Sequence, residues 1–116
     1  ISDRVDFLGW VDEPHTLMLQ SRCLIMSSLY EGSPVTLAEA IFLGLPIFSY
    51  NSSSGIQDLS CQNCDALKLS PKQNINLLAR NLAKISIVNT YYCKDCYKKI
   101  HLNQMSKQFL KLALSS

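Results

Sequence analysis

The sequence predicts an α/β fold in which a parallel sheet is flanked by helices. Short apolar segments of strand length alternate along the chain with segments whose apolar residues recur at helical spacing. This alternation is typical of parallel strands covered by helices on both faces. The chain has 116 residues, of which 47% are apolar and 17% charged, as expected for one globular domain. We therefore predict a single domain over residues 1–116, with 91–116 as a C-terminal helical tail.

The composition disfavours several other classes of protein. The formal net charge of +2 is too small to indicate a nucleic-acid partner or an anionic membrane. The longest apolar stretch, Ala40–Tyr50, contains Gly44 and Pro46 and is too short to span a bilayer. No secretory signal peptide is recognisable at the start. Five cysteines, an odd number, fit a reducing cytoplasm better than a secreted disulfide framework.

Four strands are predicted, at Arg4–Leu8, Cys23–Ser27, Pro46–Tyr50 and Ala66–Leu69. The second of these is an apolar run without alternation, so we expect it to be buried on both faces of the sheet. Outside the central region described next, helices are predicted at Thr16–Ser21, over a single turn at Ile56–Leu59, at Asn76–Ile87 and roughly at Tyr91–Leu114.

The best-defined helix lies within Tyr30–Pro46, whose sequence is YEGSPVTLAEAIFLGLP. Ser33 is suited to cap its N-terminus, and Pro34 fits the first helical position, where its missing N–H costs nothing. Gly44 fits the position just past the C-terminus, and Pro46 prevents the helix from resuming. Its apolar residues lie on one side at helical spacing: Val35, Leu37, Ala38, Ile41 and Phe42.

Two carboxylates are expected near the N-terminus of this helix. Helical side chains lean toward the N-terminus, so Glu39 leans over the first turn, and Glu31 lies in the loop just before it. The unpaired amides and the macrodipole make this end an anion site, and Gly32 lets the backbone approach a ligand closely. A nucleotide sugar suits such a site, because it offers a diphosphate to the amides and hydroxyls to the carboxylates. The alternative interpretation is a capped amphipathic helix with two solvated glutamates.

The run Val5–Phe48 resembles the C-terminal domain of family 4 retaining glycosyltransferases, which have the GT-B fold of two Rossmann-like domains. The shared features occur in order: a strand and a glycine (Phe7-Leu8-Gly9), an apolar strand ending in serine (Leu24–Ser28), Glu-Gly-x-Pro, a second glutamate in a helix, and Gly-x-Pro before another apolar strand. Glu31 and Glu39, with seven residues between them, match the family's pair of glutamates. The resemblance implies a Rossmann-like domain truncated at its N-terminus.

The resemblance also implies a function and a donor site. Such enzymes transfer a glycosyl group from a nucleotide-diphosphate sugar with retention of configuration, in glycan, polysaccharide or glycolipid biosynthesis. The catalytic candidate is Glu31, which would face the donor sugar, while Glu39 would bind the ribose hydroxyls. The base would lie near Gly9, Trp10 and Val11, and the diphosphate near Gly32, Ser33, Pro34, Val35 and Thr36. No metal or other cofactor is implied, because amides and basic side chains stabilise the leaving diphosphate.

Some family features are missing from the sequence. The family's diphosphate-binding Arg and Lys lie upstream of position 1, and neither His15 nor His101 lies where the acceptor domain's catalytic histidine would be. We therefore expect negligible transferase activity from this chain alone and an unpaired sheet edge. An acceptor glycan or lipid-linked sugar would bind the missing N-terminal domain. A basic helix face in the tail leaves peripheral contact with the cytoplasmic face of a membrane open.

Four cysteines form two CxxC pairs, Cys61 with Cys64 and Cys93 with Cys96, separated by 28 residues. Two such pairs can hold a structural zinc, although this separation is longer than in zinc ribbons. The alternative is that they are small, partly buried thiols. A non-catalytic zinc- or partner-binding module on a Rossmann-like fold is therefore the second functional hypothesis.

Overall fold

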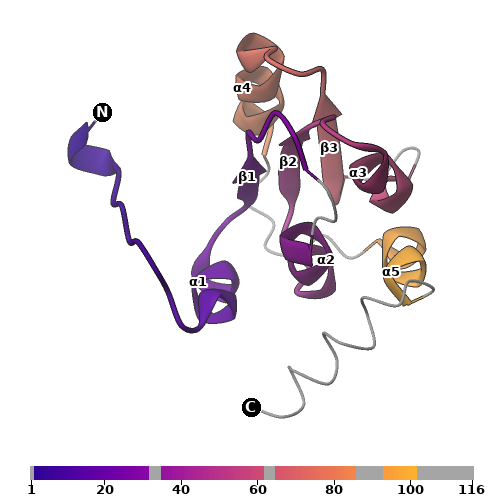
Figure 1. Ribbon diagram of the computed structural model, residues 1–116, viewed down its shortest axis with the longest axis horizontal. Helices are drawn as coiled ribbons and strands as arrows, with labels where there is room; N and C mark the ends of the chain where they lie inside the picture. The colour runs from indigo at the N-terminus through magenta and orange to yellow at the C-terminus, as the bar shows by residue number, and fades with distance from the viewer. Residues whose placement is uncertain (1, 32–34, 62–64, 86–92, 102–116) are drawn as a thin grey trace.

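The computed structural model describes residues 2–31, 35–61, 65–85 and 93–101. Within them the fold is a three-stranded parallel sheet with helices on both faces (Figure 1). The strands are β1 (Leu24–Met26), β2 (Ile47–Tyr50) and β3 (Leu67–Ser70), in the order β1-β2-β3. Ile47 is paired with Leu24 on one side and Leu67 on the other. The predicted α/β class is confirmed.

Helices precede, connect and follow these strands. They are a 3₁₀ turn at Ser2–Arg4, α1 (Pro14–Gln20), α2 (Val35–Phe42), α3 (Ser54–Leu59), α4 (Ile75–Ala83) and α5 (Lys94–His101). The predicted helices at these places are confirmed to within a few residues, except that 86–87 of the predicted helix Asn76–Ile87 and 91–92 and 102–116 of the predicted tail lie outside the described residues. None of the described helices combines the length and the apolar character needed to cross a bilayer.

Strand β2 is the centre of the sheet, and its side chains alternate between two cores. Ile47 belongs to the larger core, which α2, α3 and α5 build on one face of the sheet. Phe48 and Tyr50 belong to the smaller core on the other face, where they meet Leu78 of α4. All residues of β2 are buried, which is expected for a parallel strand covered on both faces.

The prediction that Cys23–Ser27 is buried on both faces is wrong. Strand β1 pairs only with β2 within the described part of the chain, and Ile25 at its middle is 47% exposed. Burial on both faces belongs instead to β2, since β1 lies at the edge of the described sheet. An apolar run predicts a strand but not the position of that strand in the sheet.

The predicted strand Arg4–Leu8 is also wrong. Ser2–Arg4 forms a 3₁₀ turn, and residues 5–8 have no regular structure. The segment lies apart from the sheet, and Phe7 within it is 96% exposed (Figure 1). A strand exists only where a neighbouring strand accepts and donates its hydrogen bonds, and this segment has no such neighbour in the described chain.

The C-terminus of α2 ends in the turn that the sequence predicts. Gly44 has a φ of 71°, in the left-handed region. The amide of Gly44 donates to the carbonyl of Ile41 at 3.1 Å, and the amide of Leu45 donates to that of Ala40 at 2.9 Å. This is a Schellman motif, which satisfies carbonyls at the end of a helix. Leu45 is buried directly after the turn, so the motif also aims the chain into β2.

Replacing Gly44 by alanine is therefore expected to destabilise the fold. A side chain at this φ costs about 1–2 kcal/mol of unfolding free energy. Urea denaturation followed by circular dichroism measures this loss as a lower midpoint. Gly55, inside α3, is the matched control, because alanine is favoured in a helix and Gly55→Ala should not lower the midpoint. An unchanged midpoint for Gly44→Ala would contradict the left-handed conformation described for Gly44 at the end of α2.

Candidate functional site

The carboxyl ends of the three strands lie along one edge of the sheet, because the strands are parallel. Strand β1 ends at Met26, β2 at Tyr50 and β3 at Ser70. The loops that follow carry Glu31, the serine-rich segment before α3 and Lys72. In open α/β sheets, ligands bind in the crevice beyond this edge. This edge is therefore where we look for the predicted donor site.

Glu39 is held by a residue that the sequence did not single out for this role. Its Oε1 lies 3.3 Å from Nε2 of His15, which comes from α1. The Glu39 side chain is 17% exposed, while that of His15 is 41% exposed. Because Glu39 lies one turn into α2, the contact connects α1 to the helix that begins at the candidate site. No pattern in the sequence signals the pair, since its residues lie on helices separated by a strand.

Glu31 is half-buried in the loop after β1. Its neighbour Tyr30 is exposed, and the ammonium of Lys72 lies 4.5 Å from the centre of the Tyr30 ring. A cation at this distance is attracted by the negative face of the ring. The contact places a positive charge from the loop after β3 beside the residue that precedes Glu31. Sequence reasoning missed Lys72, because the pairing depends on how two loops of the sheet edge meet.

The loop after β2 is stabilised within itself. Ser53 caps α3, its hydroxyl accepting a hydrogen bond of 3.3 Å from the amide of Ile56. The side-chain amide nitrogen of Gln57 donates to the side-chain oxygen of Asn51 at 2.9 Å. Ser52 is 7% exposed, and its hydroxyl oxygen is buried without a hydrogen-bond partner among the described residues. A buried hydroxyl of this kind is unusual and marks the loop as a place to look for a ligand contact.

The remaining predicted donor-binding residues fall into two groups. Val35 and Thr36 form the exposed first turn of α2, whereas Gly32, Ser33 and Pro34 lie outside the described residues. Gly9, Trp10 and Val11 lie on the segment that is apart from the sheet (Figure 1). Trp10 is 91% exposed, and its indole N–H donates to Asp12 at 3.0 Å. Trp10 and Val11 line an open hollow together with Thr16 and Leu17 of α1. The structure does not bring this group next to Glu31.

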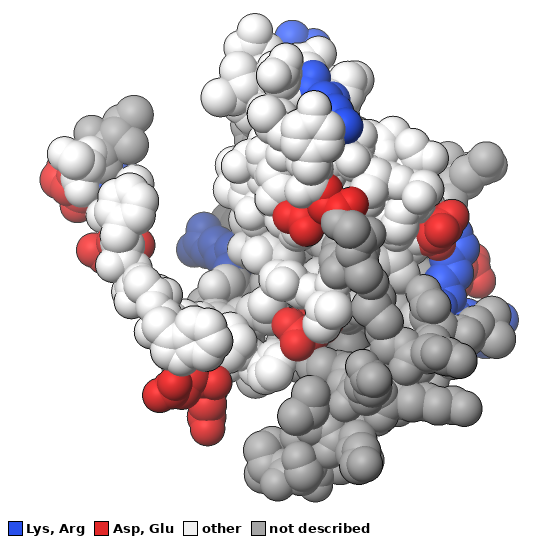
Figure 2. Space-filling model, viewed as in Figure 1, with Lys and Arg blue, Asp and Glu red and all other residues white. Residues whose placement is uncertain are grey.

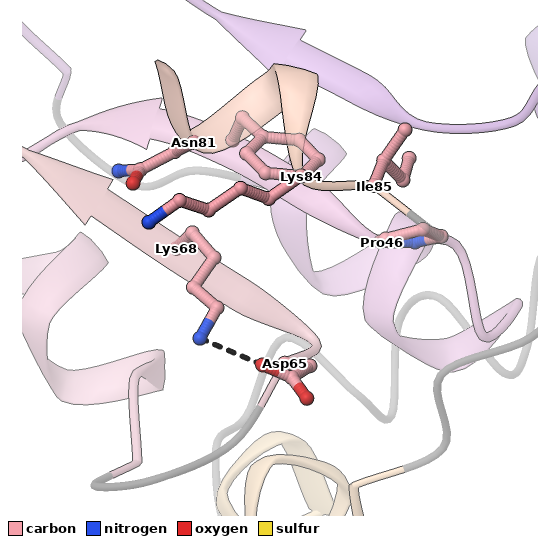
Figure 3. A pocket seen from close by; sticks show the side chains of 7 residues that line it. Pro46, Asp65, Lys68, Asn81, Lys84 and Ile85 are labelled. Atoms are coloured by element: carbon pink, nitrogen blue, oxygen red, sulfur yellow. Dashed lines mark ion pairs between the residues drawn. The ribbon is translucent and has the colours of Figure 1, made fainter. Parts of the chain in front are cut away.

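A second hollow lies at the opposite edge of the sheet. It has a volume of about 320 Å³ and is lined by Pro46 and Phe48 of the β2 segment, Asp65 and Lys68 of the β3 segment, and Asn81, Lys84 and Ile85 at the end of α4 (Figure 3). The ammonium of Lys68 forms an ion pair of 2.7 Å with Asp65. Because Pro46 and Asp65 precede β2 and β3, this hollow lies at the amino ends of the strands and is not the predicted donor site.

Charges of both signs are scattered over the face seen in Figure 2. The basic side chains visible there lie at separate places and form no continuous patch. The acidic side chains are likewise distributed, with some on the N-terminal segment and some near the middle of the face. This distribution agrees with the small net charge of +2, which disfavours a nucleic-acid interface.

The predicted cysteine set is partly assembled. Sulfur atoms of Cys61, Cys93 and Cys96 lie within 4.8 Å of one another, whereas Cys64 lies outside the described residues. Cys23 is elsewhere, packed against the smaller core, and burial raises the pKa of its thiol.

Comparison with known proteins finds relatives among glycosyltransferases. The chain is 36% identical over 63 residues to a lipopolysaccharide 1,6-galactosyltransferase of Escherichia coli, a match that covers 51% of this chain and 18% of the relative. It is 34% identical over 61 residues to an uncharacterized glycosyltransferase of Methanocaldococcus jannaschii, covering 53% of this chain and 15% of that protein.

A third relative matches over most of the chain. This is a Campylobacter jejuni α-1,4-N-acetyl-D-galactosaminyltransferase whose substrate, by its name, is a diphospho-undecaprenol-linked saccharide. It is 28% identical over an alignment of 118 positions, which covers 94% of this chain and 32% of the relative. The chain therefore spans about a third or less of each of these relatives. No solved structure gives a significant match.

The family model for glycosyl transferases group 1 matches residues 1–99, which include every described strand and nearly all of α5. Because this match covers most of the chain and the described fold is an α/β sheet, the chain belongs to the group 1 glycosyltransferase family.

Proposed function

We propose that this chain binds the nucleoside diphosphate of a sugar donor at the carboxyl edge of its sheet, as the donor-binding part of a retaining glycosyltransferase. The observation that carries the proposal is the placement of Glu39. Its carboxylate is largely buried, lies one turn from the start of α2 and is held by His15. A carboxylate fixed in this way is suited to accept hydrogen bonds from a pair of hydroxyl groups.

In this proposal, the Glu39 carboxylate binds the ribose hydroxyls. An ionised carboxylate offers about four acceptor positions on its two oxygens, and His15 lies beside only one of these oxygens, Oε1. Acceptor positions therefore remain for the two ribose hydroxyls. His15 is then a positioning residue, since it reaches the ligand only through Glu39.

The diphosphate lies at the N-terminus of α2. The free amides and the positive end of the macrodipole stabilise the negative charge that grows on the leaving diphosphate. Lys72 supplies a positive side chain at the same edge, beside Tyr30. Glu31, the next residue in the chain, faces the donor sugar, where a carboxylate stabilises positive charge at the anomeric carbon. Ser52 and its neighbours border the same edge from the β2–α3 loop.

The base is assigned to Gly9, Trp10 and Val11. The indole of Trp10 is exposed and presents an aromatic face on which a base can stack. In the structure these residues lie apart from the sheet (Figure 1), so this assignment requires the segment before α1 to approach the sheet edge when the nucleotide binds.

The acceptor is a glycan or a lipid-linked saccharide, bound by another part of a longer protein. Two relatives support this class of acceptor: one is named for lipopolysaccharide and the other for an undecaprenol-linked saccharide. The reaction then occurs at the cytoplasmic face of a membrane, and donor binding needs no metal. The donor sugar and the base remain to be identified by titration with both uridine and guanosine nucleotides.

Replacing Glu39 by alanine should weaken binding of the preferred nucleoside diphosphate by about ten- to hundredfold, since a hydrogen bond to a charged group contributes about 1.5–3 kcal/mol. Calorimetric titration with UDP and GDP, without added Mg²⁺, measures the change. Asp58→Asn, an exposed carboxylate on α3, is the matched control and should bind like the parent chain.

The same titration with the 2′,3′-dideoxy nucleotide isolates the ribose contact. Glu39→Ala should leave the affinity for that nucleotide unchanged, because the lost hydroxyls are the partners of Glu39. An equal loss for both nucleotides would assign Glu39 a structural role instead, and absence of any nucleotide binding would refute the proposed function.

Replacing His15 by alanine should weaken the same binding by a smaller factor, about threefold, because Glu39 remains but is no longer held. In a chain that already carries Glu39→Ala, His15→Ala should have no further effect on affinity, as expected for residues that act through one contact. Additive losses in the double variant would show that His15 acts independently of Glu39.

Replacing Lys72 by alanine should weaken nucleoside diphosphate binding and reduce its dependence on salt, since a surface charge acts through a screened field. The control is Lys84→Ala, which removes an exposed lysine at the opposite edge of the sheet. Titrations at low and at high salt compare the two variants. If Lys84→Ala and Lys72→Ala weaken binding equally, the effect comes from the net charge of the chain, and Lys72 has no specific role at the diphosphate site.

A further inference from the structure

Three cysteines meet at the junction of α3 and α5, away from the proposed donor site. Cys61 follows the end of α3, Cys93 directly precedes α5, and Cys96 lies in the first turn of α5. The sulfur of Cys61 lies 3.2 Å from that of Cys93 and 3.3 Å from that of Cys96. The fold thus brings together residues that are more than thirty positions apart in the sequence.

The cluster is at the boundary of the larger core. Cys96 is fully buried, while Cys61 and Cys93 are half-buried and pack against the same core. Tyr97, next to Cys96, stacks on Phe42 at the last position of α2, with ring centres 5.8 Å apart. The cluster therefore lies toward the end of α2 that is opposite the proposed diphosphate site, so a ligand here serves a different purpose from donor binding.

The spacing of the sulfurs suits a metal ion. Four sulfurs that surround zinc at about 2.3 Å in a tetrahedron lie about 3.8 Å from one another. The three sulfurs here lie within 4.8 Å of one another, and the two shorter separations need to open by only about half an ångström. A disulfide would use two of these sulfurs and leave the third, whereas one zinc ion uses all of them.

Groups of positive polarity lie beside the sulfurs. The carbonyl of Cys93 accepts a hydrogen bond of 2.9 Å from the amide of Tyr97, which places Cys93 at the start of α5. Two of the cysteines thus lie at the N-terminal, positive end of a helix, beside which a negatively charged metal–sulfur cluster is accommodated. Lys99 adds positive charge by donating a hydrogen bond to the carbonyl of Ser60, the residue before Cys61. Asp95, the acidic residue of the same turn of α5, is exposed.

We propose that Cys61, Cys93 and Cys96 bind a structural Zn²⁺ ion that fastens α5 to the end of α3. Each thiol loses its proton to solvent, and each thiolate donates an electron pair to the zinc; no group is oxidised or reduced. These sulfurs supply three of the four donors of a tetrahedral ion. Cys64 lies outside the described residues, and the proposal does not depend on it. The zinc site is also independent of the proposed donor binding.

Metal analysis of the chain purified without added zinc is the first test. We expect about one zinc per chain in the parent protein and in Cys23→Ala, the matched control, whose thiol belongs to the other core. Cys61→Ala and Cys93→Ala should lower zinc affinity at least tenfold, measured by competition with a chromogenic chelator. Both residues are half-buried, so these substitutions disturb the core less than a change at Cys96. Circular dichroism verifies that the variants keep their helices.

Cobalt substitution and chelation are the second test. Co²⁺ bound to the parent chain should show the intense thiolate-to-metal absorption of a tetrahedral sulfur site, weakened in Cys61→Ala and Cys93→Ala. A chelator should lower the melting temperature of the parent and of Cys23→Ala more than that of those two variants, because the stabilisation by a ligand bound only to the folded state falls with its affinity. Zinc-free protein that takes up no added zinc, or parent-like zinc affinity in both variants, would overturn the proposal.

Discussion

Strand β2 is the part of the structure on which the rest depends, because it is paired on both edges and covered on both faces. Ile47 and Phe48 point into different cores, so the strand needs helices on both faces to bury its apolar surface. The parallel pairing with β1 and β3 then requires crossover connections, whose helices α2 and α3 both cover the face of the larger core, and it gathers the loops after the strands at one edge. The position of the candidate donor site follows from this arrangement and not from any single residue in it.

Local chemistry in the sequence predicted α2 and its ends well. The φ of Gly44 and the hydrogen bonds around it depend on residues close in the chain, so they can be inferred without knowing the fold. The alternation of strands and helices likewise predicted the fold class. Burial was less predictable: Ile25 and Phe48 are both apolar residues of short strands, yet one is 47% exposed and the other 4% exposed. The two residues differ in exposure because β2 has a paired strand on each side and β1 on only one side of the described sheet, and this pairing depends on the whole fold.

The candidate site shows the same division between local and long-range information. The spacing of Glu31 and Glu39 is a local pattern, and the resemblance of the flanking strands gave it a meaning. His15 and Lys72 reach the two glutamate regions from α1 and from the β3–α4 loop. Their roles depend on contacts between elements that are far apart in the chain, for which a single sequence holds no signal. The cysteines combine both kinds of information. Each CxxC pair is a local pattern in the sequence, but the contact of Cys61 with Cys93 and Cys96 depends on how the chain folds.

The late position of α5 has a consequence for synthesis of the chain on the ribosome. Cys96 and Ile100 complete the larger core over α2 and α3, although the three described strands are finished by Ser70. The apolar sides of α2 and α3 therefore stay partly uncovered while about thirty further residues are translated, which at typical elongation rates of about 5–20 residues per second takes a few seconds. During that interval the nascent chain presents an open core to chaperones and to other unfolded chains. Closure of the core is thus timed by the arrival of a helix that lies outside the sheet.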